Sequence, residues 1–373
     1  MSKAPASREP LLVELREAFD YATDQWREIR KEGQIDMRYV AGDPWEPKDR
    51  KAREDAGRPA LSLDELGQYH NQTINDVRGQ PLSMKFAPTG NGANDTGAEF
   101  YQNKAREIEY RSHAQVAYVT AYENAVERGY GFVRVNTKYA HDRSMDQDIT
   151  IEPLPNPDLV TADPDALMPD GSDQTICFIH ERRSVKQFRK QFPKASIQDF
   201  GPDIIEAAPS WLAGDQVRLA ETWRVETKPR TLIAFTHDQQ PGRVVTVFED
   251  EAQQHGVPSG WSENQRRTVQ FPRVKKYLIN GVEVLEETDW PGRYIPIIWC
   301  LGKVLYVDLG GGSKRIILSQ TRLARDAAML YCYYRTAEAE VVGRVPKIPA
   351  IGYEGQFDGH EAEWQESVQQ PKA

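Results

Sequence analysis

Residues 123–139 read ENAVERGYGFVRVNTKY, and there a helix pattern changes to a strand pattern within a few positions. Charged residues at helical spacing stop at Gly129 and Gly131, and apolar residues at strand spacing follow over 132–135. We predict that Gly129 ends the helix in a left-handed conformation, which costs least without a Cβ atom. We predict that Gly131 lets the chain reverse into the strand. Helix and strand patterns mixed in this way predict an α+β fold.

Similar patterns predict the other elements. Apolar residues at steps of three and four indicate an amphipathic helix over 12–29. Residues 98–128 fit one long helix or two joined ones, and VKKYLINGVEVLEE predicts a hairpin with a type I′ turn at Asn280 and Gly281. The remaining predictions are a polar loop over 41–59, a capping box of Ser62 and Glu65, a strand over 82–88, and an edge or loop-bordering strand interrupted by Pro296.

Composition excludes several classes of protein. The 373 residues include 47 Lys and Arg against 56 Asp and Glu, so the formal net charge is −9. Such a chain has no global attraction for nucleic acid, although a local patch can still bind it. No run of about 18 apolar residues predicts a membrane span. The three cysteines are far apart in sequence, and we interpret them as buried, inert thiols.

The sequence offers few motifs with a chemical role. GGGSK at 310–314 lacks the spacing of a phosphate-binding loop, so a flexible linker is favoured. The carboxylates of Asp163, Asp165, Asp170 and Asp173 are candidate Ca²⁺ ligands, but they lack the EF-hand order, and turn formation is favoured. The basic residues over 182–194 fit a phosphate contact less well than a solvated helix face with a core side. We therefore predict no catalytic, cofactor-binding or metal-binding residue.

The predicted helix over 315–343 is the most informative candidate. Its apolar stripe has a heptad-like spacing and comprises Leu323, Ala327, Leu330, Tyr334, Ala337 and Val341. Its charges oppose the helix dipole, with Arg315, Arg322 and Arg325 near the start and Glu338 and Glu340 near the end. Such a helix gains little stability alone and is expected to depend on contacts with neighbouring elements. The pattern fits a buried helix of the same chain and a contact between subunits equally well, and in the second case Arg335 and Glu338 join the stripe as interface candidates.

Several stretches together resemble the portal proteins, or head-to-tail connectors, of tailed double-stranded-DNA phages, in the large type typified by short-tailed phages. They occur in the family's order and are MRYVAGDPW (37–45), RPALSLDELGQYHNQTINDVRG (58–79), AYENAVERGYGFVRV (121–135), PNPDLVTADPDALMPDGSD (155–173), VKKYLINGVEVLEETDWPGRYIPII (274–298) and RDAAMLYCYYRTAEAE (325–340). The chain departs from the family's usual residues at Pro44, Asp64, Ala328 and Cys332.

This resemblance implies a wing-like body over 1–314, a stem-like helix over 315–343 and the start of a clip over 344–373. Family members are longer, so the chain is expected to be the N-terminal portion of a portal. The rest of the clip, a second stem helix, the tunnel helix and the crown would be missing. Gly129 and Gly131 would then belong to the wing scaffold, with no role in chemistry.

The resemblance also implies a non-enzymatic subunit, without cofactors, of a ring of usually twelve copies at one capsid vertex. Double-stranded DNA would pass through without sequence-specific binding. The implied partners are the major capsid protein, the terminase large subunit and head-tail adaptor or tail proteins, with assembly in the host cytoplasm and no membrane contact. The alternatives are a nucleic-acid-processing enzyme with Mg²⁺ on Asp163, Asp165 and Asp170, and a scaffold or adaptor module without a channel.

Overall fold

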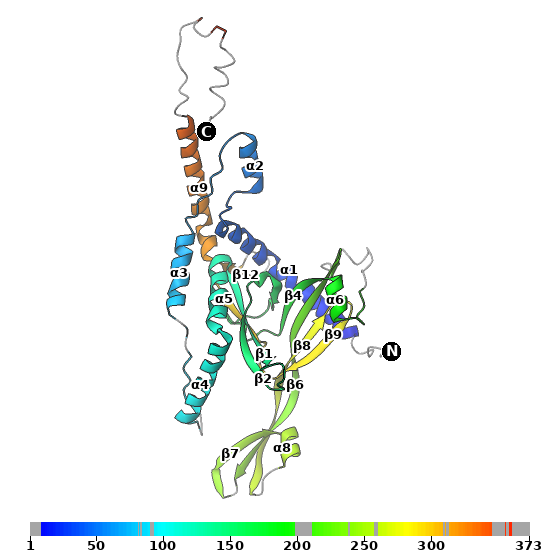
Figure 1. The fold of residues 1–373 in the computed structure, drawn as a ribbon. Coiled ribbons are helices and arrows are strands. Elements are labelled where there is room, and N and C mark those ends of the chain that lie inside the picture. Colours follow the sequence, from blue (N-terminus) through cyan, green and yellow to red (C-terminus); the bar gives the residue numbers. More distant parts are fainter. Residues whose placement is uncertain are drawn as a thin grey trace. The chain divides into compact units, whose positions relative to one another are not determined.

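A computed structural model gives the fold (Figure 1). It describes residues 9–80, 82, 84–89, 93–197, 211–237, 239–256, 260–308, 310, 313–344, 355 and 358–359. Helices and sheets are mixed along the chain, which confirms the predicted α+β class. The chain forms two compact units, each built from separate stretches of sequence. The first comprises Met1–Glu28, Met84–Ala121 and Gly131–Cys300, and the second comprises Ile29–Ser83, Tyr122–Tyr130 and Leu301–Ala373.

A seven-stranded antiparallel sheet organises the first unit. Its strand order is β3-β4-β6-β8-β9, and β5 and β7 also pair with β6. Its strands are β3 (Val160–Ala162), β4 (Ile176–Ser184), β5 (Leu212–Ala213), β6 (Gln216–His237), β7 (Gln240–Phe248), β8 (Trp261–Ile279) and β9 (Val284–Trp290). The two short helices α6 (Val185–Gln191) and α8 (Glu249–His255) follow β4 and β7, and η1 (Pro157–Leu159) precedes β3. The β6–β8 ladder runs from Ala220 paired with Ile279 to His237 paired with Trp261.

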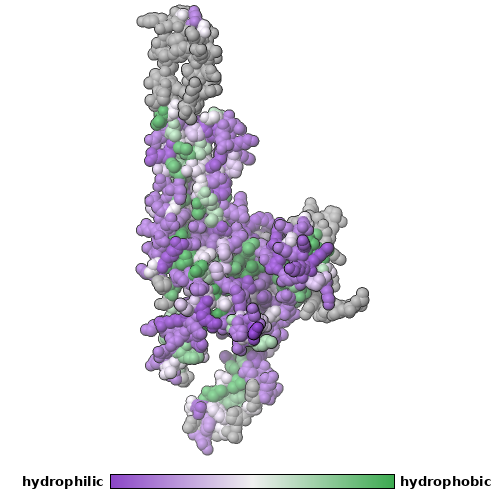
Figure 2. Space-filling view, in the orientation of Figure 1, coloured by the Kyte–Doolittle hydropathy of each residue, from purple (hydrophilic) through white to green (hydrophobic). Residues whose placement is uncertain are grey.

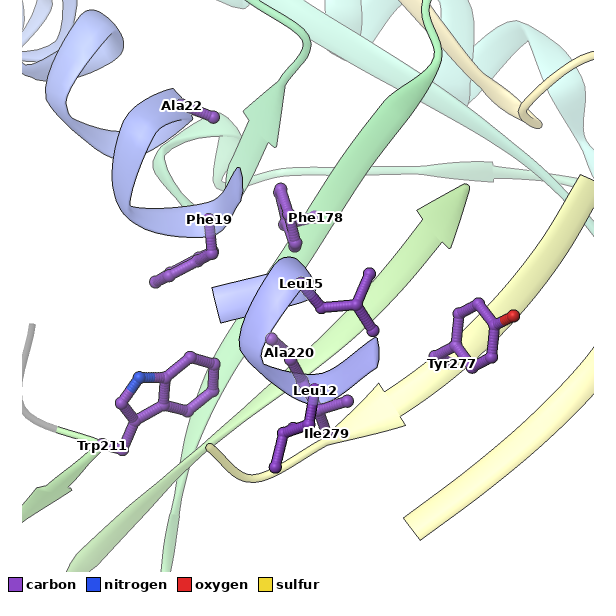
Figure 3. Close-up of a cluster of buried hydrophobic side chains, with 9 residues drawn as sticks. All are labelled: Leu12, Leu15, Phe19, Ala22, Phe178, Trp211, Ala220, Tyr277 and Ile279. Atoms are coloured by element: carbon purple, nitrogen blue, oxygen red, sulfur yellow. The ribbon is translucent and has the colours of Figure 1, made fainter. Parts of the chain in front are cut away.

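The N-terminal part of α1 (Glu9–Val40) packs on this sheet (Figure 3). The predicted apolar face is buried as expected, from Leu12 to Trp26. Phe19 meets Phe178 of β4 edge to face, with ring centroids 5.1 Å apart. The indole Nε1 of Trp26 donates a hydrogen bond of 2.9 Å to the carbonyl of Ala162. The helix therefore covers the sheet with large apolar side chains, and the polar Nε1 of Trp26 has a hydrogen-bond partner.

A smaller sheet in the first unit has the order β10-β1-β2, with β1 (Tyr130–Tyr139), β2 (Gln147–Pro153) and β10 (Ile297–Leu301). β10 lies at its edge, which confirms the prediction made from Pro296. The long helical stretch is two helices, α4 (Asp95–Ser112) and α5 (Ala114–Arg128). His113 separates them with φ 51°, a left-handed conformation that ends α4.

The second unit is built around α9 (Gln320–Arg344), together with α2 (Pro47–Asp55), α3 (Gly67–Gly79) and the hairpin of β11 (Lys303–Asp308) and β12 (Ser313–Leu318). The predicted helix start at 315 is wrong. β-branched Ile316 and Ile317 favour the strand β12, and a serine cap then starts the helix at Gln320. The predicted wing, stem and clip division stays a prediction, and most of the expected clip lies outside the described residues.

Three local predictions are also corrected. Pro47 suits the first turn of a helix, so the loop over 41–59 contains α2. The cap of α3 comes from Asp64, whose Oδ1 accepts from the backbone N–H of Gly67 at 2.8 Å, and not from Ser62. The described residues of 82–88 form no strand.

The predicted hairpin at Asn280 exists, but its turn is not type I′. The loop has four residues between Ile279 and Val284, and Gly281 has φ +82° while Asn280 does not have a positive φ. A type I′ turn requires positive φ at both central residues. Instead, the side-chain oxygen of Asn280 accepts from the backbone N–H groups of Val282 and Glu283 at 3.0 and 2.9 Å.

The two glycines of the helix-to-strand switch have different constraints. Gly129 has φ +99°, the left-handed region that a helix stop requires, and its N–H still bonds to the carbonyl of Ala125. Gly131 does not have a positive φ. A Cβ atom on Gly131 would lie 2.0 Å from the carbonyl oxygen of Ala121, so close backbone approach, and not chain reversal, requires glycine there.

We expect Gly129→Val to lower the free energy of unfolding by about 1–3 kcal/mol, because a β-branched residue is strained at this backbone position. The new Cβ would also lie 3.3 Å from Cγ2 of Ile317. Urea unfolding monitored by circular dichroism measures the loss. Gly79→Val is the matched control, because a Cβ there meets nothing within 4 Å and φ is not positive. Equal midpoints for the two variants would contradict the helix-stop interpretation.

Candidate subunit interface

Helix α9 begins at a buried serine cap in the second unit. Ser319 Oγ accepts from the backbone N–H of Arg322 at 2.8 Å and donates to Oδ2 of Asp36 in α1 at 2.8 Å. In the first turn, the hydroxyl of Thr321 lies 3.2 Å from Nε2 of His70 in α3. Burial lowers the pKa of His70, opposed by the charge of Asp64. α1 and α3 therefore fix the start of α9 through polar contacts.

The arginines near the start of α9 are paired with two carboxylates of α1. Arg325 lies 3.3 Å from Asp36 and also bonds to Glu32, while Arg322 lies within 3.6 Å of both acids. Burial raises the pKa of the Asp36 carboxyl, and the Ser319 hydrogen bond and the two arginines oppose this. Burial would also raise the pKa of Glu32, but the hydrogen bond from Arg325 and the charge of Arg322 hold it low.

A corresponding set of contacts lies near the other end of α9. Glu340 accepts from Arg53 of α2 at 3.0 Å and from Arg58 at 2.9 and 3.2 Å. The guanidinium of Arg53 lies 4.8 Å from the ring centroid of Trp45 and 5.2 Å from that of Tyr333. These contacts supply the neighbours that the unfavourable charge pattern of α9 predicted.

Between the two ends, α9 is bound to the segment that joins α2 to α3. The backbone N–H of Leu61 donates to Oγ1 of Thr336 at 3.1 Å. One turn earlier on α9, Cys332 Sγ lies 3.4 Å from the N–H and 3.5 Å from the carbonyl oxygen of Leu63. Cys332 and Thr336 are both buried. Their polar atoms satisfy the backbone of an extended segment, so the buried face of α9 is largely polar.

The apolar stripe of α9 lies on the opposite face. Leu330 and Cys332 are two residues apart, which is about 200° around an α-helix. Leu323 is 68% exposed, Leu330 52%, Tyr334 64% and Val341 62%. Ala327 is also exposed, and Ala337 is half-buried. Figure 2 shows hydrophobic side chains among hydrophilic ones in the area that α9 occupies in Figure 1. Among the described residues, the stripe is therefore not the core of a buried helix.

Arg335 and Glu338, the two charged interface candidates, pair with each other along α9 at 2.8 Å. Arg335 also donates from Nε to the hydroxyl of Tyr331 at 3.1 Å. Both side chains are about half exposed, so the pair is accessible from solvent beside the stripe.

The other sequence candidates have local structural partners. Asp163 Oδ2 accepts from the N–H and the hydroxyl of Thr175, and Asp173 accepts from the backbone N–H groups of Leu167 and Met168. Asp170 caps Ser172, and the hydrogen bonds from Ser172 hold the pKa of Asp170 low. The turn interpretation of this cluster therefore fits the geometry.

The basic stretch over 182–194 has the expected core side. Phe188 is buried with Val217 and Leu219, and Val185 and Phe192 pack against this cluster. Of the GGGSK motif, Ser313 and Lys314 lie in β12, so this part of the predicted flexible linker is wrong. All three cysteines are free. Cys177 and Cys332 are buried, and burial raises the pKa of the Cys177 and Cys300 thiols.

None of the described helices is long and apolar enough to cross a bilayer. In the same part of the chain, histidine, cysteine, aspartate and glutamate side chains form no group of three or more that could hold a metal ion.

Sequence reasoning missed the partners of α9. Glu32 and Asp36 are four residues apart on α1, and Arg322 and Arg325 are three apart on α9, so each pair shares a helix face. This match of charge and spacing could have predicted the pairing of α1 with α9 from the sequence. The pairing of Arg53 and Arg58 with Glu340 had no such signal, because α2 itself was not predicted.

A sequence-family model described as Phage P22-like portal protein matches residues 16–373. No curated protein matches the chain.

We expect Glu340→Gln to destabilise the subunit by about 1–3 kcal/mol at neutral pH, because two arginines lose a charged partner. The hydrogen bond from Arg58 is the main cause that lowers the pKa of Glu340 from 4.5. A lowered pKa gives stability that is present above 4.5 and is lost as the pH falls through the folded-state value. The difference between parent and variant should therefore shrink on acidification. Urea midpoints across pH 3 to 7 measure it, with the exposed Glu338→Gln as control, and a difference independent of pH would refute the pairing.

Proposed function

The chain belongs to the P22-like phage portal protein family, and from that premise we propose that it assembles into a closed ring around a channel for viral DNA. Portal proteins are structural components of the phage virion at the head-to-tail connection. The ring would occupy one capsid vertex, with twelve copies as the family resemblance suggests. DNA would be packaged and later ejected through it.

The observation that carries this proposal is the exposed stripe of α9. Monomeric proteins rarely leave an ordered row of apolar side chains in water, and such rows commonly mark protein–protein contacts. The buried face of the same helix is already satisfied by α1, by α2 and by the segment after α2. The stripe is thus free to contact another subunit without any rearrangement of the fold. Ala327 and Ala337 in the stripe would permit close approach of that subunit.

The charge balance supports a channel that does not hold DNA tightly. The formal net charge is −9, and a protein with this balance has no long-range attraction for a polyanion. We propose that DNA passes without sequence-specific binding. The energy for packaging would come from the ATP-hydrolysing terminase, and the portal itself would carry out no catalysis.

The proposed partners follow from this position in the virion. The major capsid protein would surround the ring, the terminase large subunit would dock during packaging, and head-tail adaptor or tail proteins would bind afterwards. Assembly would take place in the host cytoplasm before the portal is built into the capsid.

We expect Ala327→Glu to abolish ring assembly, because the substitution places a charge in every copy of the apolar contact. The subunit should still fold, because the new side chain is exposed to water in the free subunit. Sedimentation velocity and negative-stain microscopy at matched concentration measure assembly, and thermal melting measures folding. Ala52→Glu is the matched control, since Ala52 is an exposed alanine of α2. Rings formed by Ala327→Glu as readily as by the parent would exclude this helix as the interface.

A further inference from the structure

A closed ring requires two different surfaces on each subunit, because head-to-tail contacts join unlike faces. The stripe of α9 supplies only one of them. The proposed ring therefore leaves open which part of the neighbouring subunit receives the stripe. The second unit offers a specific answer in the segment that joins α2 to α3.

This segment exposes apolar side chains. Leu61 and Leu63 are 37% and 39% exposed, and Tyr69 at the start of α3 is 57% exposed. Leu61 and Leu63 are two residues apart in extended chain, so they point to the same side. We define Leu61, Leu63 and Tyr69 as the back patch. The backbone N–H groups of Leu61 and Leu63 are held by Thr336 and Cys332 of α9, so the position of these two residues on the subunit is fixed.

The segment that carries Leu61 and Leu63 of the back patch is bound to the side of α9 opposite the stripe. Cys332 and Thr336, which bind the segment, face about half a turn away from Leu330 and Tyr334. A subunit with an apolar surface on each side of one helix can contact a neighbouring subunit on each side. This is the arrangement that a head-to-tail ring needs, whereas a two-fold dimer would use one patch twice.

The stripe and the back patch also lie at matching positions along α9. The segment runs antiparallel to the helix, and its contacts pair Arg58 with Glu340, Leu61 with Thr336, Leu63 with Cys332 and His70 with Thr321. Leu61 and Leu63 thus lie level with Tyr334 and Leu330, and Tyr69 lies near the level of Leu323. Neighbouring subunits of a closed ring are related by a rotation without translation along the ring axis. Where α9 runs along that axis, residues of neighbouring copies therefore meet at the same position along the helix.

We propose that the stripe of α9 docks on the back patch of the next copy of this chain, with Leu330 and Tyr334 against Leu61 and Leu63 of that copy. This inference rests on the proposed ring. It deepens that proposal by naming the receiving surface and by making the contact head to tail.

A disulfide between copies tests the contact directly. The double variant Leu63→Cys, Leu330→Cys is made in a Cys332→Ser background, because Cys332 would otherwise react with the new thiol at 63. The serine hydroxyl can donate and accept as the thiol does. Within one chain, positions 63 and 330 are separated by the body of α9, which exceeds the Cα separation of about 4.4–6.8 Å that a disulfide allows. Any crosslink between these positions therefore joins two copies.

On oxidation of assembled subunits, we expect a ladder of covalent multimers on a non-reducing gel, which collapses to monomer on reduction. Neither single cysteine variant should give the ladder. Dimers from Leu330→Cys alone would show stripe against stripe and overturn the inference. If the double variant forms rings normally but gives no ladder, the inference is overturned while the proposed function stands. Subunits of the parent that form no ring would overturn both.

A second variant gives an independent readout. Leu63→Glu should lose ring assembly as Ala327→Glu does, with the melting temperature of the subunit unchanged. Leu167→Glu is the matched control, because Leu167 is 69% exposed and lies far from the segment in sequence. Normal assembly of Leu63→Glu would overturn the inference, and equal loss in the control would do the same.

Discussion

The paired charges between α9 and α1 are the interaction on which the second unit depends. Asp36 is fully buried and lies within reach of Ser319, Arg322 and Arg325. A buried carboxylate without partners would be strongly destabilising, so this group fixes which face of α9 turns inward. Once the polar face is inside, the helix geometry leaves the apolar stripe in water. The exposure of the stripe is therefore a consequence of the inner pairing and not an independent feature.

This arrangement would separate folding from assembly in the proposed ring. Charged groups of α9 are paired within the same chain, with Glu32 and Asp36 at one end of the helix and with Arg53 and Arg58 at the other. In the proposed ring, the contact with another subunit is made by apolar side chains, which gain from burial in proportion to area and need little geometric precision. Exposed ion pairs such as Arg335 with Glu338 contribute little to stability, so we expect the stripe to dominate the proposed contact.

Local sequence patterns predicted the N-terminal half of α1, the helical stretch of α4 and α5, and the β8–β9 hairpin. It failed where a local choice depended on distant partners. The heptad spacing of α9 was visible, but the same spacing serves a buried and an exposed stripe. What decides between them is the pairing of Arg325 with Glu32, 293 residues away in sequence. Gly131 was expected at a reversal, yet the carbonyl of Ala121 requires glycine there, and no sequence pattern shows that contact.

Family membership and physical reasoning contribute different parts of the functional conclusion. The family match assigns a portal role to the chain as a whole but says nothing about individual side chains. Among the carboxylates that suggested the alternative of a metal enzyme, Asp163 accepts from the backbone N–H of Thr175 and Asp173 accepts from that of Leu167. The stripe of α9 is an apolar surface that the described part of the chain leaves exposed, and burial of apolar surface favours association. We propose that the residues through which such a subunit functions are those that another copy covers.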